Sequence, residues 1–125
     1  MFTLRLTNPV TRRLHIGGTV VREGWEILNV VPETWVDHIG KAEDLSGFED
    51  NTFAEVYASH VLEHLDYQST LPAALKEWHR VLAPEGRLMV SVPDLGTLCK
   101  LYSQQHSLTP EDRYNIMRMM FWWPG

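Results

Sequence analysis

A strand, a helix and a second strand in close succession constrain the fold of this chain more than any other feature of its sequence. Residues 53–60, FAEVYASH, mix β-branched and aromatic residues after a turn signal, and residues 86–93, GRLMVSVP, form a continuous apolar run. Between them, LPAALKEWHRVL places four apolar side chains at helical spacing: Leu71, Leu75, Trp78 and Leu82. This order predicts two parallel strands joined by a helix, with the second strand buried on both faces of its sheet.

Earlier segments extend the predicted sheet. RLHI at residues 13–16 runs into glycines, EILNVVP at residues 26–32 is stopped by a proline, and WVDHIG at residues 35–40 is an ambiguous third strand. About nine residues separate the first two strands, which is fewer than a helical crossover needs but enough for an extended return. We therefore predict one α/β domain over residues 1–125, with an open, mostly parallel sheet of about five strands and flanking helices.

Another helix is predicted near the C-terminus. Thr109 can cap a helix that has Pro110 at its first position and Asp112 three residues after the cap. The helix is apolar on more than one side, through Tyr114, Ile116, Met117, Met119, Met120, Phe121, Trp122 and Trp123. Three interpretations stay open: the helix packs on its own sheet as a missing layer, its surplus Met and Trp surface forms the interface of a homodimer, or the chain is part of a longer one.

Composition excludes several classes of protein. The net charge of −5 gives no general cationic surface, so nucleic acid is a disfavoured partner. A single cysteine, Cys99, rules out an internal disulfide and suits a reducing compartment. No apolar run approaches the roughly 20 residues that span a bilayer, and the N-terminus lacks the apolar stretch of a signal peptide. We expect a cytoplasmic protein that does not act at a membrane.

His60, Glu63 and His64 form an H-x-x-E-H pattern directly after the strand at residues 53–60. On a helix these three side chains would share a face and could hold zinc, as they do in the inverted zincin motif. A strand end favours a different interpretation, because ligands of parallel sheets bind beyond the carboxyl ends of the strands. His60 therefore lies at the expected ligand edge of the sheet, or in a polar turn whose side chains pair locally.

Four segments in order, LHIGGT, GWEILNVVP, DLSGFEDNTFAEVYASHVLEHL and ALKEWHRVLAPEGRLMVSVPDLGTL, resemble the class I S-adenosylmethionine-dependent methyltransferases, especially the type 11 group. The resemblance covers about residues 13 to 100 and implies a Rossmann-like sheet. We expect the sheet of residues 1–125 to lack the last two strands of the methyltransferase sheet. In that family the H-x-L-E-H sequence at the end of the fourth strand carries no metal, so the resemblance implies no metal site here.

The resemblance also implies that S-adenosylmethionine is the cofactor. The positions that it carries over to the cofactor site are His15, Gly17, Gly18, Val31, Lys41, Ala42, Ser59 and His60. Several depart from the family pattern. The first turn reads Gly-Gly-Thr in place of G-x-G, Val31 stands where an acid is expected, and Lys41 stands where aspartate is usual. Glu43 and Asp44 are close enough in sequence to substitute for that aspartate.

Two functions follow from these observations. The first is a methyltransferase that transfers a methyl group from S-adenosylmethionine to a small-molecule or other acceptor, which the sequence does not identify. His60 and Asp94 are its candidate catalytic residues, with Glu63 a further candidate by position. The alternative is a non-catalytic, methyltransferase-like binding or assembly subunit that no longer binds the cofactor. Val31, Lys41 and the missing strands favour this alternative, since fold alone does not establish function.

Overall fold

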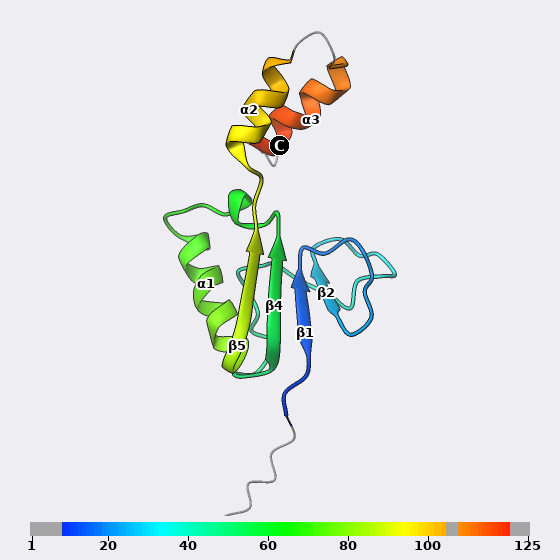
Figure 1. Cartoon of the computed structure of the whole chain (residues 1–125). Helices are drawn as coiled ribbons and strands as arrows, with labels where there is room; N and C mark the ends of the chain where they lie inside the picture. The colour runs from blue at the N-terminus through cyan, green and yellow to red at the C-terminus, as the bar shows by residue number, and fades with distance from the viewer. Residues whose placement is uncertain (1–8, 105–107, 121–125) are drawn as a thin grey trace, which may run out of the picture.

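A computed structural model describes residues 9–104 and 108–120 (Figure 1). The strands are β1 (Arg13–Ile16), β2 (Glu26–Asn29), β3 (His38–Ile39), β4 (Phe53–Ser59) and β5 (Leu82–Ser91). The helices are α1 (Thr70–Val81), α2 (Leu95–Ser103) and α3 (Pro110–Met120), with a short 3₁₀ helix, η1 (Leu62–His64), after β4. No helix in these described ranges is long and apolar enough to cross a membrane.

The strands form one parallel sheet in the order β3-β2-β1-β4-β5. This arrangement confirms the predicted open α/β, Rossmann-like fold. The nine-residue connection from β1 to β2 contains no helix, as its length predicts. β1 has β2 on one side and β4 on the other, so the chain reverses its direction of progress across the sheet between β1 and β4.

The core lies between the sheet and α1. Trp78, Ala74 and Val81 of α1 are completely buried and pack in one cluster with strand residues such as Leu14 and Val56. The buried stripe therefore differs from the one predicted from leucine spacing. Leu71 is half-buried, Leu75 is 41% exposed, and Leu82 already belongs to β5. Leucine spacing predicted the helix correctly, but the face that it buries is formed by Ala74, Trp78 and Val81.

β5 is an edge strand within the described sheet, and the prediction that it is buried on both faces is wrong. Leu88 and Val90 remain 38% and 41% exposed, because no described strand pairs with the outer side of β5. The strand also begins earlier than predicted. Its first residues include Glu85 with φ of 65°, and its register against β4 is irregular there. Gly86 is required at this bulge, since a Cβ would lie 2.7 Å from the Ala83 carbonyl oxygen.

α2 and α3 form a hairpin beyond the carboxyl ends of the strands (Figure 1). α3 begins as predicted: the Thr109 hydroxyl accepts from the Asp112 amide (3.1 Å), and the Asp112 carboxylate accepts from the Thr109 amide (2.9 Å). In the described residues α3 packs on α2, so the interpretation of this helix as a missing layer of the sheet is wrong. The predicted helix residues 121–125 lie outside the described residues.

Candidate functional site

The point where the sheet reverses, between β1 and β4, brings two predicted site segments together. Gly17 follows β1 with φ of 75°, a conformation that favours glycine, and its amide donates to the Leu28 carbonyl (2.8 Å). A Cβ on Gly17 would lie 3.6 Å from the Ser59 carbonyl oxygen and only 2.7 Å from the Val61 side chain. The end of β1 and the end of β4 are therefore in close contact, and only glycine allows it.

The polar residue at the end of β2 is Asn29, which sequence reasoning missed. The resemblance implies that Val31 stands there, but β2 ends two residues earlier, and Val31 is 38% exposed in the following loop. Asn29 donates through Nδ2 to the Gly18 carbonyl (2.9 Å), and its Oδ1 accepts from the Val31 amide (3.4 Å). An asparagine within an otherwise apolar run was the signal that could have identified the strand end.

His15 lies beneath the glycine turn, on the sheet face opposite α1. Its ring stacks on Tyr57 at 4.7 Å between centroids, and the side chain is 8% exposed. Burial lowers its pKa, which favours the neutral imidazole. A Cβ on Gly18 would lie 2.7 Å from His15 Nδ1, so this histidine supports the turn from below.

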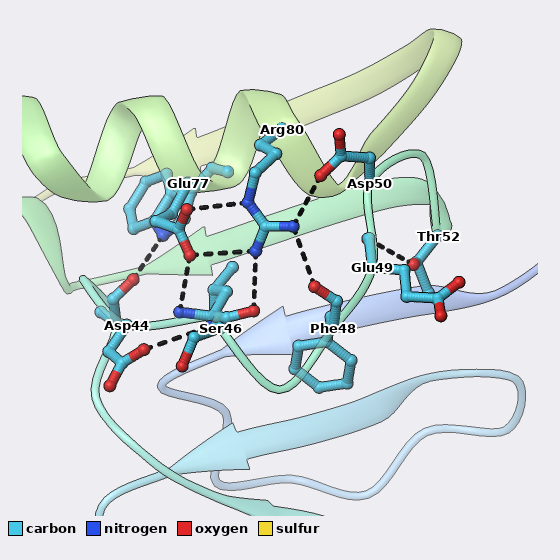
Figure 2. A network of polar contacts seen from close by, with 11 residues as sticks. Asp44, Ser46, Phe48, Glu49, Asp50, Thr52, Glu77 and Arg80 are labelled. Carbon is cyan, nitrogen blue, oxygen red and sulfur yellow. Dashed lines mark hydrogen bonds and ion pairs between the residues drawn. The ribbon is translucent and has the colours of Figure 1, made fainter.

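The loop between β3 and β4 contains the predicted residues Lys41 and Ala42 near its start, and α1 holds it in place (Figure 2). Trp78 Nε1 donates to the Ala42 carbonyl (2.8 Å), while the Leu45 amide donates to Glu77 Oε2 (3.1 Å). Lys41 itself is exposed. The position of Ala42 is therefore set by the largest fully buried side chain of α1.

Arg80 fixes the rest of this loop. Its guanidinium donates to the carbonyl oxygen of Leu45 (2.8 Å). The same group donates to the carbonyl oxygen of Phe48 (2.9 Å), which is labelled in Figure 2. It also donates to both carboxylate oxygens of Glu77 and to Asp50. Hydrogen bonds with these two carboxylates raise the pKa of Arg80, so its charge is permanent. One cation thus joins helix and loop into a single unit.

The end of β4 carries a line of hydroxyl groups. The Ser91 hydroxyl of β5 lies 3.2 Å from that of Ser59 and 3.1 Å from that of Tyr57. Hydrogen bonds with the two serines lower the pKa of Tyr57. Directly after Ser59, His60 has φ of 54°, and its amide donates to the Ser91 carbonyl (2.9 Å). This positive φ is uncommon for histidine, and it turns the chain out of the sheet at the reversal point.

His60, Glu63 and His64 form a local cluster. Glu63 Oε1 lies 3.6 Å from His60 Nδ1 and 3.8 Å from His64 Nε2. Burial lowers the pKa of His64. The three residues do not share one α-helix, because His60 precedes the single turn of η1. Within residues 9–104 and 108–120, no three His, Cys, Asp or Glu side chains are grouped so that they could hold a metal ion.

Asp94 caps α2. Its carboxylate accepts from the Gly96 amide (3.1 Å) and from the Thr97 hydroxyl (2.6 Å), and these bonds lower its pKa. The capping bonds account for an aspartate at this position without any contact to a ligand. Its predicted role near the acceptor stays a prediction.

A comparison with protein families matches residues 27–90 to the type 11 family described as Methyltransferase domain. The match runs from β2 into β5 and covers half of the chain. The chain belongs to this methyltransferase domain family. A search of curated proteins and a search of solved structures each found no match. The methyltransferase domain thus confirms the resemblance seen in the sequence, and the predicted roles of individual site residues stay predictions.

Proposed function

We propose that this methyltransferase domain binds S-adenosylmethionine and transfers its methyl group to an acceptor. The observation that carries this proposal is the meeting of Gly17 and Ser59 at the reversal point between β1 and β4. In open parallel sheets this is the point where ligands bind, outside the carboxyl ends of the strands. Family membership supports the same conclusion independently.

The residues at this point fit the cofactor in part through their backbone and in part through side chains. Gly17 and Gly18 carry no side chains of their own, and Val61 and His15 fill the space where a Cβ would lie, so only the remaining sides of this backbone can meet a ligand. Asn29 offers an amide and Ser59 a hydroxyl, and either group can bond to ribose hydroxyls. Val31 and Lys41 do not fit the roles predicted for them, because neither can accept a hydrogen bond from a hydroxyl or an amine. We assign the ribose contact to Asn29.

S-adenosylmethionine, when bound, supplies a methyl group on a sulfonium. The contribution of this chain is mainly positioning, since an in-line displacement requires donor and acceptor to be close and aligned. The positive φ of His60 turns the chain at the end of β4, next to Ser59, and 57% of its side chain is exposed. His60 can therefore take a proton from an acceptor while Glu63 stands 3.6 Å from its other ring nitrogen.

Calorimetric titration of the metal-stripped protein with S-adenosylmethionine and S-adenosylhomocysteine tests the proposal. We expect dissociation constants in the range of about 1–100 μM for the unchanged protein. Asn29→Ala should weaken binding about tenfold, because it removes the side chain assigned to the ribose. Val31→Ala is the matched control and should leave affinity unchanged. Equal effects of the two substitutions would contradict the assignment of Asn29.

The alternative function is a methyltransferase-like binding or assembly subunit without cofactor. Two features favour it: Asn29, and not an acid, stands at the end of β2, and the exposed Lys41 stands where an acid is usual. The same titration decides between the two functions. No binding of either ligand up to about 1 mM would exclude a working cofactor site and support the alternative.

We also propose that α3 contributes to a homodimer interface. Tyr114 is 67% exposed and Met117 is 47% exposed in the chain by itself, which gives this helix apolar surface available to a partner. Size-exclusion chromatography with light scattering at high protein concentration measures the state directly. A dimer that Tyr114→Glu converts to a monomer supports the proposal, and a monomer of the unchanged protein contradicts it.

A further inference from the structure

Two adjoining hollows lie between the end of β4 and the α2–α3 hairpin. Their volumes are about 380 Å³ and about 320 Å³, and both are lined by Glu63, Pro93 and Met119. Each falls within the size range of small-molecule sites. The second hollow is also lined by His60, so the pair begins at the reversal point of the sheet.

The larger hollow has an apolar wall, formed by Leu62, Val92, Pro93, Leu95, Leu98 and Met119. Three of these side chains are unusually exposed for large apolar groups: Val92 at 52%, Leu95 at 58% and Met119 at 46%. Exposed apolar surface is unfavourable in water, and an apolar ligand that covers it gains free energy in proportion to the area removed. The wall therefore suits the hydrocarbon part of a small molecule.

The smaller hollow is lined by His60, His64 and Arg118, with Glu63 as its carboxylate. Glu63 faces the two imidazoles at 3.6 and 3.8 Å. Across residues 9–104 and 108–120, no carboxylate forms an ion pair with Arg118. A guanidinium thus lines the hollow without a direct ion pair to any carboxylate of the described residues, including Glu63. Its planar fork of N–H donors matches a carboxylate in geometry and charge.

We propose that the two hollows bind a small molecule with an apolar body and a carboxylate, which pairs with Arg118. This inference rests on the proposed function, for which it supplies the class of methyl acceptor. His60 belongs both to the hollow and to the predicted cofactor site, so an acceptor bound here lies beside the end of β4. The apolar wall selects the body of the molecule, and Arg118 selects its charged end.

Titration with hexanoate, without cofactor, tests the site. Hexanamide is the matched neutral probe, because it has the same apolar body and no charge. We expect hexanoate to bind at least about fivefold more tightly than hexanamide. Arg118→Gln should abolish this difference. The control is Lys100→Gln, which removes the same charge from α2 but not from the hollow, and it should keep the difference.

Three outcomes would overturn the site. The unchanged protein binds hexanoate and hexanamide equally, Arg118→Gln and Lys100→Gln reduce the preference for hexanoate equally, or hexanoate does not bind up to about 50 mM. Arg118 is exposed, so its substitution should leave the thermal unfolding midpoint unchanged, and circular dichroism checks this. S-adenosylhomocysteine titrated separately into each variant keeps the two proposals distinct. A preference for hexanoate without binding of S-adenosylhomocysteine would support this site and contradict the proposed methyl transfer. Binding of S-adenosylhomocysteine without a preference for hexanoate would support the cofactor site and contradict this one.

Discussion

The α1 side of the sheet and its carboxyl edge are built in contrasting ways. On the α1 side, Trp78 is completely buried, and Arg80 bonds to two carbonyl oxygens of the β3–β4 loop (Figure 2). At the carboxyl edge, large apolar side chains such as Leu95 remain exposed around open hollows. The α1 side, called the fixed region below, holds the strands and the β3–β4 loop in place. The carboxyl edge leaves room for ligands between the strand ends and the α2–α3 hairpin.

Removing the central side chain of the fixed region should have the largest effect. Trp78→Ala leaves a cavity at a fully buried site and frees the Ala42 carbonyl, so we expect a loss of about 3–5 kcal/mol in the free energy of unfolding. Urea denaturation measures this loss. Leu75→Ala on the exposed side of the same helix is the control and should cost less than about 1 kcal/mol. Similar losses in the free energy of unfolding at Trp78 and Leu75 would contradict the assignment of Trp78 to the core of the α1 side.

Removing the cation that joins α1 to the loop should have the next largest effect. Arg80→Ala removes the guanidinium donor from the Phe48 carbonyl and leaves the Leu45 carbonyl with the Phe48 amide alone, and we expect a loss of about 2–3 kcal/mol. Arg87→Ala provides a control, because Arg87 pairs with Glu55 while 69% of its side chain is exposed, and such pairs contribute less than about 1 kcal/mol. Chemical denaturation measures the free energy of unfolding of both variants. A larger loss for Arg87→Ala than for Arg80→Ala would contradict the account.

The pH dependence of stability provides a third test of the fixed region. The Arg12 guanidinium and the His38 imidazole contact Glu26 and lower its pKa from 4.5 to about 2. Because the folded pKa is depressed, the contribution of Glu26 is complete above about pH 4.5 and is lost as the pH falls towards 2. We expect a loss on the order of 2 kcal/mol over this range. Glu26→Gln should remove that part of the pH dependence, and an unchanged profile would contradict the assignment.

The smallest effect should come from the hairpin. Thr109→Ala removes the hydroxyl that caps α3, and we expect a local loss of about 1 kcal/mol. Hydrogen exchange should show faster exchange in α3 and unchanged exchange in β4, because α3 packs on α2 and not on the sheet. Thr11→Ala at an exposed position outside any helix is the control. Faster exchange throughout the sheet would show that hairpin and sheet are not separate regions.

The sequence predicted the fold where local patterns decide it. The strand at residues 53–60, the helix after it and the capping box at Thr109 all carry signals within a few residues, and the structure confirms them. The predictions were wrong where contacts between distant parts of the chain decide the structure. The exposure of Leu88 depends on which strand has a neighbour, and the position of the hairpin depends on packing between α2 and α3. Neither leaves a periodic pattern.

The candidate site was predicted in part for the same reason. Gly17 and His60 could be placed at strand ends because strand ends and glycines are visible in a sequence, and their positive φ angles show that the chain turns there. Their roles toward a cofactor stay predictions. Asn29 was missed because a strand end two residues earlier than expected changes which side chain stands there. Nothing in the sequence pointed to Arg118, because Arg118 lies 58 positions after His60. The two residues line one hollow only because the α2–α3 hairpin folds back over the end of β4.

Hydrogen exchange with and without S-adenosylhomocysteine tests the central claim most directly, because it locates the bound ligand. The account predicts slower exchange in peptides that contain Gly17 and Gly18 and in peptides that contain Ser59 and His60. Exchange in peptides from α1 should be unchanged, since α1 lies on the face of the sheet, away from the strand ends. Unchanged exchange at both strand ends under a saturating ligand concentration would contradict a cofactor site at the reversal point between β1 and β4.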